Sequence, residues 1–389
     1  MKTKSTYWFI SLLLIQFLAG CANPPTITSL PLSPTLALPA TNTPTVTPLI
    51  TPTPEIRFTQ QCLPIDDIEM DLSDLAFGTI QLFSAEIDYH FTLKEIRSGI
   101  DHKPSVESKN FVLGSDEVSP NRNMVTVMGY DEQHTKAILW VLDARANILA
   151  ETSIQRTDLG PLRWLDNERL TIETDDYGVL VLVNPFTGEQ RVINNELPDL
   201  EPRIRWPIAY SSDLEWVTYY SWRQKNSQNS VEGPVVYDVA KQQTIWNAGN
   251  GAGSNPAWSP DGQELAFTSG MDEYQLYLFS RSGNIKAVLD DSLPHRAFAF
   301  SWSPDGNYIA FWNADSLMVY DRQKDWVFDT CVPGYEIGVT GSPLWSPDSQ
   351  KIIVHSGSTQ PLLVDWEKQR VYKINYIEDS MIIGWMNSP

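Results

Sequence analysis

Histidine and cysteine, two residue types that commonly form catalytic or metal centres, are scarce in this chain. Its 389 residues include three cysteines and five histidines, and the histidines show no ligand spacing. There is no G-x-S-x-G, no H-E-x-x-H, no Walker loop and no EF-hand spacing, which argues against α/β-hydrolases, zincins, P-loop NTPases and EF-hand proteins. We therefore interpret the histidines as surface or packed residues: His90, His102, His134, His295 and His355.

Positive charge is also scarce. Lys and Arg total 28 against 48 Asp and Glu, which gives a net charge of −20. A chain of this charge repels phosphate backbones, so nucleic-acid binding is not expected. The same charge disfavours contact between its folded surface and an anionic bilayer.

No apolar run is long enough to span a bilayer comfortably. The longest, YWFISLLLIQF (7–17), follows Lys2 and Lys4 and has the geometry of a signal peptide. It ends in LAGC (18–21), which resembles the bacterial lipobox. That resemblance implies a signal peptide over 1–20 and a diacylglycerol and an acyl chain such as palmitate on Cys21, which together anchor a protein durably to a membrane. An ordinary secretory signal with a chance cysteine is the alternative.

Residues 21–56 form a separate region. Nine of the 35 residues from 22 to 56 are Pro and nine are Thr, as in ATNTPTVTPLITPTPE. Such a segment cannot bury a core and favours extended, disordered conformations. We interpret it as a tether that holds a folded domain away from the membrane.

One short phrase recurs in the second half of the chain. WSPDG begins at Trp258 and at Trp302, and WSPDS begins at Trp345, at intervals of 44 and 43 residues. Weaker copies start at 210, 164 and 118. Ser, Pro, Asp and Gly suit successive positions of a type I turn. Strand-like segments follow each turn, and four short strands in about 40–45 residues are typical of a β-propeller blade.

The repeat predicts an all-β fold, a propeller of seven four-stranded blades over 75–389, after a lead-in segment over 57–74. Upstream of the first anchor, 75–96 contains strands without an inner partner, and MIIGWMN (381–387) supplies an orphan strand at the other end. Pairing the two closes the ring and removes its open edges. Six or eight blades stay open as alternatives because the first unit is divergent. The tryptophans that end or lie in the inner strands are interpreted as structural anchors that pack between blades: Trp164, Trp258, Trp302, Trp345 and Trp385.

WSPDGQELAFTS and SWSPDGNYIAFWN resemble the repeats of TolB-like, WD-repeat-related propellers of bacterial envelopes. The resemblance is sharp over about 258–356 and implies the fold more than a function. TolB-like proteins carry an α/β domain ahead of the propeller, whereas this chain has a tether there, which puts a Tol-system role in doubt. Similar repeats precede the hydrolase domains of oligopeptidases.

Carboxylates recur in the turns between the second and third strands of five blades. Ordinary solvated turns are one interpretation, because Asp favours turns. The other is a rim that binds a cation such as Ca²⁺ or a basic partner. The SPDG aspartates themselves are expected to be turn residues, since one Asp per turn is no coordination shell. The candidate rim consists of Glu86, Asp88, Asp131, Glu132, Asp175, Asp176, Asp272, Glu273 and Asp315.

Cys62 and Cys331 are the two thiols that remain once Cys21 is lipidated. Export implies a compartment in which disulfides persist. In a closed ring the sixth blade lies near the first, so a segment crossing the rim can bring Cys62 to Cys331. Two unpaired thiols are the alternative.

The sequence therefore predicts a lipid-anchored propeller on the exported face of the cell membrane or outer envelope, which binds or scaffolds protein, peptide or glycan without catalysis and without a required cofactor. A propeller enzyme of hydrolase or lyase type, with its site assembled from loops at the central cavity, is the alternative. A third interpretation is a surface sensor of sugars or peptides that uses exposed aromatics such as Trp222.

Overall fold

The computed structural model describes most of the chain from residue 56 onwards. The described residues are 56–69, 79–84, 91–95, 100–102, 117–130, 136–154, 159–174, 179–194, 197, 208–221, 233–247, 253–269, 275–288, 297–313, 316–333, 341–354, 361–374 and 380–387. All the regular elements among them are strands. In this part of the chain no helix is long and apolar enough to cross a bilayer.

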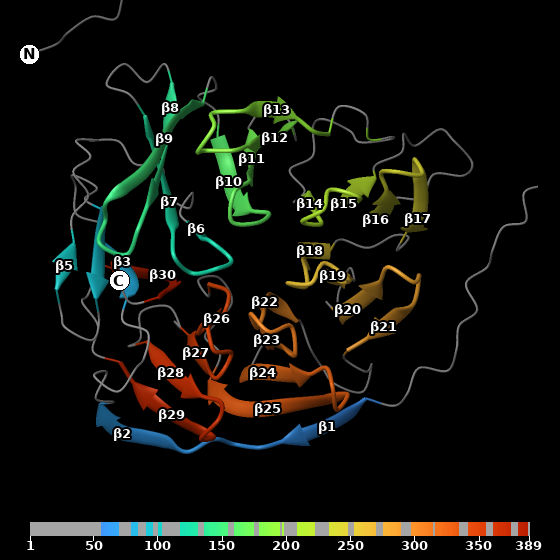
Figure 1. The fold of residues 1–389 in the computed structure, drawn as a ribbon. Coiled ribbons are helices and arrows are strands. Elements are labelled where there is room, and N and C mark those ends of the chain that lie inside the picture. Colours follow the sequence, from blue (N-terminus) through green and yellow to red (C-terminus); the bar gives the residue numbers. More distant parts are fainter. Residues whose placement is uncertain are drawn as a thin grey trace, which may run out of the picture. The chain divides into compact units, whose positions relative to one another are not determined.

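Seven antiparallel sheets make up the fold, and each contains one repeat of four strands. Figure 1 looks along the axis of the ring, with the inner strands around the centre. Blade 1 joins the two ends of the domain: β30 (Ser380–Met386), β3 (Thr79–Ser84), β4 (Phe91–Glu95) and β5 (Asp101–His102). Blade 2 is β6 (Glu117–Val118), β7 (Val125–Tyr130), β8 (Ala137–Leu142) and β9 (Ile148–Ile154). Blade 3 is β10 (Leu159–Trp164), β11 (Leu170–Thr174), β12 (Val179–Val183) and β13 (Gln190–Val192).

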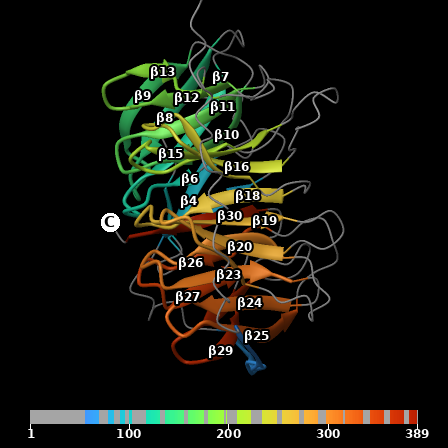
Figure 2. The same cartoon turned by 90° about the vertical axis from the view of Figure 1, so that its right-hand side faces the viewer.

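The other four blades follow in chain order, and Figure 2 shows from the side how blade 6 follows blade 5. Blade 4 is β14 (Ala209–Tyr210), β15 (Trp216–Ser221), β16 (Gly233–Asp238) and β17 (Gln243–Asn247). Blade 5 is β18 (Gly253–Trp258), β19 (Glu264–Ser269), β20 (Gln275–Ser280) and β21 (Ile285–Ala287). Blade 6 is β22 (Phe298–Trp302), β23 (Tyr308–Trp312), β24 (Ser316–Asp321) and β25 (Trp326–Pro333). Blade 7 is β26 (Leu344–Trp345), β27 (Lys351–Val354), β28 (Leu362–Asp365) and β29 (Arg370–Lys373).

The predicted seven-bladed propeller and its closure are confirmed. β30 pairs with β3 antiparallel, with Ile80 opposite Trp385 and Phe83 opposite Met381. Gly384 on β30 faces blade 2 so closely that a Cβ there would meet Val118 Cγ2 at 2.6 Å. A glycine is therefore required where the closing strand passes its neighbour.

The anchor tryptophans connect the blades into a ring. Each lies in the inner strand of its blade, and its indole N–H donates to a backbone carbonyl on the inner strand of the preceding blade. The five bonds run from Trp164 to Glu117, Trp258 to Ala209, Trp302 to Ala257, Trp345 to Ser301 and Trp385 to Leu344. An indole needs a partner when it is buried, and here its partner fixes the spacing of adjacent blades.

The lead-in segment adds a fifth strand to each of two blades. β1 (Arg57–Gln60) runs parallel to β25, and β2 (Ile65–Glu69) runs parallel to β29, so the segment lies along the outer edge of blades 6 and 7 (Figure 1). Between the two strands, Cys62 forms a disulfide with Cys331, and their Cα atoms are 4.7 Å apart. The structure thus contains the cysteine pair expected from the sequence.

Candidate functional site

The turn after the inner strand has the same internal geometry in five blades, with a serine hydroxyl bonded to the Asn or Asp two residues later, and the SPDG phrase encodes it. In blade 5, Ser259 Oγ donates to Asp261 Oδ1 at 2.6 Å and accepts from the Glu264 amide at 2.9 Å. Asp261 Oδ1 also accepts from the Gln263 amide. The aspartate is therefore used within its own turn, as the sequence analysis expected.

The last position of this turn requires left-handed backbone. Glycine fills it in blades 5 and 6, where φ is 65° at Gly262 and 71° at Gly306. Other residues hold the equivalent position in blades 2, 4 and 7, where φ is 62° at Arg122, 61° at Leu214 and 59° at Ser349. Non-glycine residues are strained in this region by about 1–2 kcal/mol, so Arg122 is held there at a cost that glycine would avoid.

Arg122 lines a cavity of about 530 Å³ that lies among the inner strands of blades 2 to 6. This volume lies within the range of small-ligand sites. Much of the wall is indole and proline, including Trp164, Trp258, Trp302, Pro120, Pro256, Pro260 and Pro304. Few charged groups interrupt it: Glu117, Arg122, Arg163 and Asp166.

Arg163 crosses the short inner strand of blade 4. Its Nη1 donates to the carbonyl oxygen of Pro256 at 3.0 Å, which joins β10 of blade 3 to β18 of blade 5. β14, the inner strand of blade 4 between them, contains only Ala209 and Tyr210. The side chain of Arg163 therefore bridges blades 3 and 5 across a short inner strand.

Arg122 is the least satisfied charged group in the cavity. Its Nε is buried and makes no hydrogen bond in the described part of the chain. Burial lowers the pKa of Arg122 below its usual value, and the Glu117 carboxylate opposes that shift. A buried N–H without a partner costs free energy, so Arg122 is held in its turn at a cost.

The carboxylates of the cavity are already hydrogen-bonded. Glu117 Oε2 accepts from the Trp164 amide at 2.5 Å. Asp166 is paired with Arg169, whose Nη2 lies 2.6 Å from Asp166 Oδ2. No group of three or more His, Cys, Asp or Glu that could hold a metal ion occurs among the described residues.

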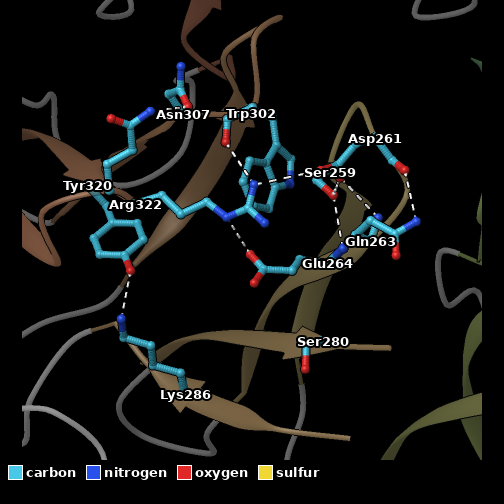
Figure 3. Close-up of polar contacts among 12 residues, drawn as sticks. Ser259, Asp261, Gln263, Glu264, Ser280, Lys286, Trp302, Asn307, Tyr320 and Arg322 are labelled. Atoms are coloured by element: carbon cyan, nitrogen blue, oxygen red, sulfur yellow. Dashed lines mark hydrogen bonds and ion pairs between the residues drawn. The ribbon is translucent and has the colours of Figure 1, made fainter. Parts of the chain in front are cut away.

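A second polar network joins blades 5 and 6 outside the cavity, and it is drawn in Figure 3. Arg322 Nε lies 2.8 Å from Glu264 Oε2, and its guanidinium lies over the Trp302 ring at 5.9 Å. Lys286 Nζ donates to the Tyr320 hydroxyl at 3.0 Å. Burial raises the pKa of Tyr320, so its hydroxyl stays protonated and donates to Asp325 Oδ1 at 2.8 Å. Every group here has a partner, and we interpret the network as a connection between blades.

A cavity of about 680 Å³ lies between blades 6 and 7, beside the lead-in segment. Tyr308, Trp326, Phe328 and Trp366 form its aromatic wall. Its aspartates serve turns, as Asp305 does with Ser303 and Asn307. The aspartates at this cavity are thus occupied by the fold.

The other residues predicted from the sequence fall outside the described part of the chain. These are Cys21, Trp222 and the whole candidate acidic rim: Glu86, Asp88, Asp131, Glu132, Asp175, Asp176, Asp272, Glu273 and Asp315. The cation or basic-partner interpretation of that rim stays a prediction.

Sequence reasoning missed Glu117, Arg122 and Arg163. One signal was present for Arg122: VSPNRN (118–123) aligns with WSPDGQ, so an arginine replaces the glycine of the turn. That signal does not single out Arg122, because Leu214 and Ser349 also replace glycine at the same left-handed position. Glu117 and Arg163 carry no comparable signal.

No family model matches the chain. It is 41% identical over 104 residues to the "Uncharacterized peptidase YuxL" of Bacillus subtilis (strain 168), a match that covers 26% of this chain and 16% of that protein. Among solved structures it resembles the tricorn protease, with a TM-score of 0.53 and 12% identity, over 83% of this chain and 34% of that one. It also resembles an oligogalacturonate lyase in complex with manganese, with a TM-score of 0.53 and 14% identity, over 78% of this chain and 87% of that one. These structures support the propeller fold, a fold that hosts both enzymes and binding proteins.

Proposed function

We propose that this chain is a lipid-anchored propeller of the bacterial envelope, on the exported face of a membrane, which binds a ligand in its central cavity without transforming it. The observation that carries the proposal is the cavity among blades 2 to 6. It has the volume of a ligand site and an apolar wall, with one buried guanidinium that has an unpartnered donor. A protein, peptide or glycan segment is the class of ligand.

The groups that line this cavity suit ligand binding better than catalysis. General acid–base catalysis needs a titratable group placed to exchange a proton near neutral pH. A guanidinium only donates hydrogen bonds, so Arg122 and Arg163 are binding groups. Asp166 is paired with Arg169, and Glu117 accepts a backbone N–H.

A propeller enzyme of hydrolase or lyase type is the second candidate. The structural resemblance to a protease and to a lyase, and the short match to a protein named as a peptidase, favour it. Its site would be assembled from loops at the cavity.

A photo-crosslinking experiment separates the two. The full chain is made in its host with p-benzoylphenylalanine at Pro260, which is exposed and lines the cavity, or at Phe186, which is 44% exposed in the outer turn of blade 3. Binding in the cavity predicts a crosslinked ligand at Pro260 and none at Phe186. Equal capture at both positions would contradict a cavity site.

The captured molecule is then incubated with the unmodified chain. Recovery of the molecule unchanged supports a binding protein. Its conversion into a product would establish the enzyme instead.

A further inference from the structure

Backbone hydrogen bonds identify one equivalent position in blades 4 to 7, directly after the third strand. Its amide donates to the carbonyl that lies two residues after the turn aspartate of the same blade. The four bonds run from Val239 to Glu215, Arg281 to Gln263, Arg322 to Asn307 and Trp366 to Gln350. The position is therefore valine in blade 4, arginine in blades 5 and 6, and tryptophan in blade 7.

In blades 5 and 6 the arginine at this position crosses to the turn of the preceding blade. Arg281 Nη1 lies 2.6 Å from Asp213 Oδ2 of blade 4. Arg322 Nη1 lies 3.9 Å from Asp261 Oδ2 of blade 5 (Figure 3). Each guanidinium also lies over the anchor tryptophan of its own blade, at 5.6 and 5.9 Å. Two successive junctions thus pair a turn carboxylate with a stacked guanidinium.

The charges on the two sides of a junction match, with one exception. The turn of blade 3 has the neutral Asn167 where blades 4 to 7 have aspartate, and blade 4 accordingly has Val239 at the arginine position. The turn of blade 6 keeps its aspartate, Asp305, but blade 7 has Trp366 in place of an arginine. Within the described residues Asp305 has hydrogen-bond partners in its own turn and no ion pair. This junction therefore lacks the cation that the repeat provides at the two junctions before it.

Lys324, which lines the cavity beside Asp305, does not supply this cation. Its Nζ lies 2.9 Å from Asp321 Oδ2, and blades 4 and 7 repeat that lysine–aspartate contact in the same turn. The contact therefore belongs to the hairpin. The bonds of Asp305 within its turn do not exclude a cation either, because Asp213 makes equivalent bonds and still pairs with Arg281.

A cavity occupies the junction at which the arginine is missing. Asp305 and Trp366 both line the cavity of about 680 Å³ between blades 6 and 7. Trp366 and Tyr308 are partly exposed there, and their rings meet at 73° with centroids 6.1 Å apart. Arg57 of the lead-in segment lies over Trp326 of the same wall at 5.6 Å, so this wall accepts a guanidinium. The cavity thus offers aromatic rings and a carboxylate, the two contacts that the arginines make at the other junctions.

We infer that the cavity between blades 6 and 7 binds the guanidinium of an arginine side chain from a peptide ligand, with Asp305 as its counter-ion and Trp366 and Tyr308 as its aromatic contacts. The ligand takes the place that arginines of the chain itself occupy at the two preceding junctions. Gln61 and Gln350 also line the cavity, and their amide groups can pair with a peptide backbone. A net charge of −20 attracts a basic peptide. This cavity shares no lining residue with the one among blades 2 to 6, so the inference goes beyond the proposed function and does not depend on it.

A pair of small probes tests the site directly. N-acetylarginine amide carries the guanidinium, and N-acetylcitrulline amide is its uncharged isostere. In the full chain labelled with ¹⁵N-tryptophan, the indole N–H signal of Trp366, identified as the one lost in W366F, should shift saturably with the arginine probe. Trp246, half-buried in the outer strand of blade 4, is the internal control and should shift little. Equal binding of the two probes would overturn the inference, as would a shift at Trp366 no larger than that at Trp246.

The carboxylate is tested by D305N. Asparagine preserves the turn, because Asn121 accepts the same serine and amide bonds in blade 2. Affinity for the arginine probe should fall at least about tenfold in D305N, since the counter-ion is lost. It should stay unchanged in D143N, which alters a turn aspartate of blade 2. Wild-type affinity in D305N would contradict the assignment of this site.

The repeat itself supplies the last variant. W366R introduces the arginine that blades 5 and 6 have at this position, so the chain should fill its own site and lose the arginine probe. Binding is then followed by saturation transfer to the probe, since the Trp366 signal is absent. W366F removes the indole without adding a cation and is the matched control, in which weakened binding should persist. Binding to W366R as strong as to W366F would reject the inference.

Discussion

Replacing Arg122 by glycine should make the protein more stable. The exchange removes the strain of a non-glycine residue with φ of 62°, which raises the free energy of unfolding by about 1 kcal/mol. It also removes a buried Nε that has no partner in the described structure, which raises the free energy of unfolding by about another 1 kcal/mol. Glycine costs about 0.5–1 kcal/mol through the entropy of the unfolded chain. The expected net gain in the free energy of unfolding is about 1 kcal/mol.

The assay is chemical denaturation of the full chain, in which the midpoint should rise while the slope stays unchanged. G306A is the matched reverse exchange. The added Cβ would meet only Pro260 Cδ at 3.7 Å and Arg322 Nη1 at 3.9 Å, so its expected loss of about 1 kcal/mol comes from the left-handed backbone alone.

A fall in stability for R122G, with the expected fall for G306A, would refute the reasoning. It would mean that the guanidinium stabilises the turn of blade 2 by more than its strain and its unpartnered donor cost.

Four further predictions follow from the structure. Partial burial acts to raise the pKa of Asp213, but hydrogen bonds from Arg281, Ser211 and the Glu215 amide outweigh it and hold that pKa at about 2. Because the folded pKa lies below the unfolded one, the stabilisation is present above about pH 4 and is lost as the pH falls toward 2. Between these two pH values D213N should therefore lose about 1 kcal/mol less unfolding free energy than wild type, after allowance for solvent screening. The C62S/C331S double variant should lose up to about 5 kcal/mol, since the bridge spans 269 residues; peptide mapping without reductant checks the link. G384V should unfold at lower denaturant than wild type because its side chain meets blade 2. Cys21→Ser should abolish labelling by a radioactive fatty acid.

Each of these has a defined contrary result. An acid-unfolding curve for D213N parallel to that of wild type would show that the carboxylate is not stabilising. Two freely alkylated thiols in protein exported from its host would reject the disulfide. An unchanged midpoint for G384V would mean that the closing strand can move away from blade 2, and persistent fatty-acid labelling of Cys21→Ser would reject the lipid anchor.

The blades could be predicted because their information is local. A turn such as SPDG, a tryptophan before it and alternating apolar residues after it all lie within a dozen residues, and hairpins form between neighbours in the chain. Closure was also predictable, since MIIGWMN had no partner nearby and the first unit had no inner strand. Pairing two incomplete units is what ring geometry requires.

The lead-in strands could not be predicted from RFTQ and IDDIE. Both segments are short and polar, and they pair in parallel with strands about 270 to 300 residues further along the chain. Their attachment comes from backbone hydrogen bonds to an edge that exists only in the folded ring, together with Leu63, which is buried against blade 7 and its neighbours. The cavity was hidden for the same reason, because Arg122, Arg163 and Glu117 face one another only after the blades have assembled.

The position of the disulfide bears on how an anchored ring would withstand force. The closing strands β30 and β3 hold the ring through hydrogen bonds and packing, and strands of this kind separate when pulled. The described chain enters at Ile56, packs along blade 6 through β1, and is bonded covalently to that blade at Cys62 before it reaches β3. A pull transmitted from an anchor at Cys21 therefore reaches the β1–β25 pairing and the Cys62–Cys331 bond before it reaches the closing sheet. The parallel strand spreads the load over the backbone bonds from Arg57 to Gln60, and the covalent bond stops its transfer to blade 1. In a protein tethered as we propose, the clasp thus protects blade 1, where the pairing of β30 with β3 closes the ring.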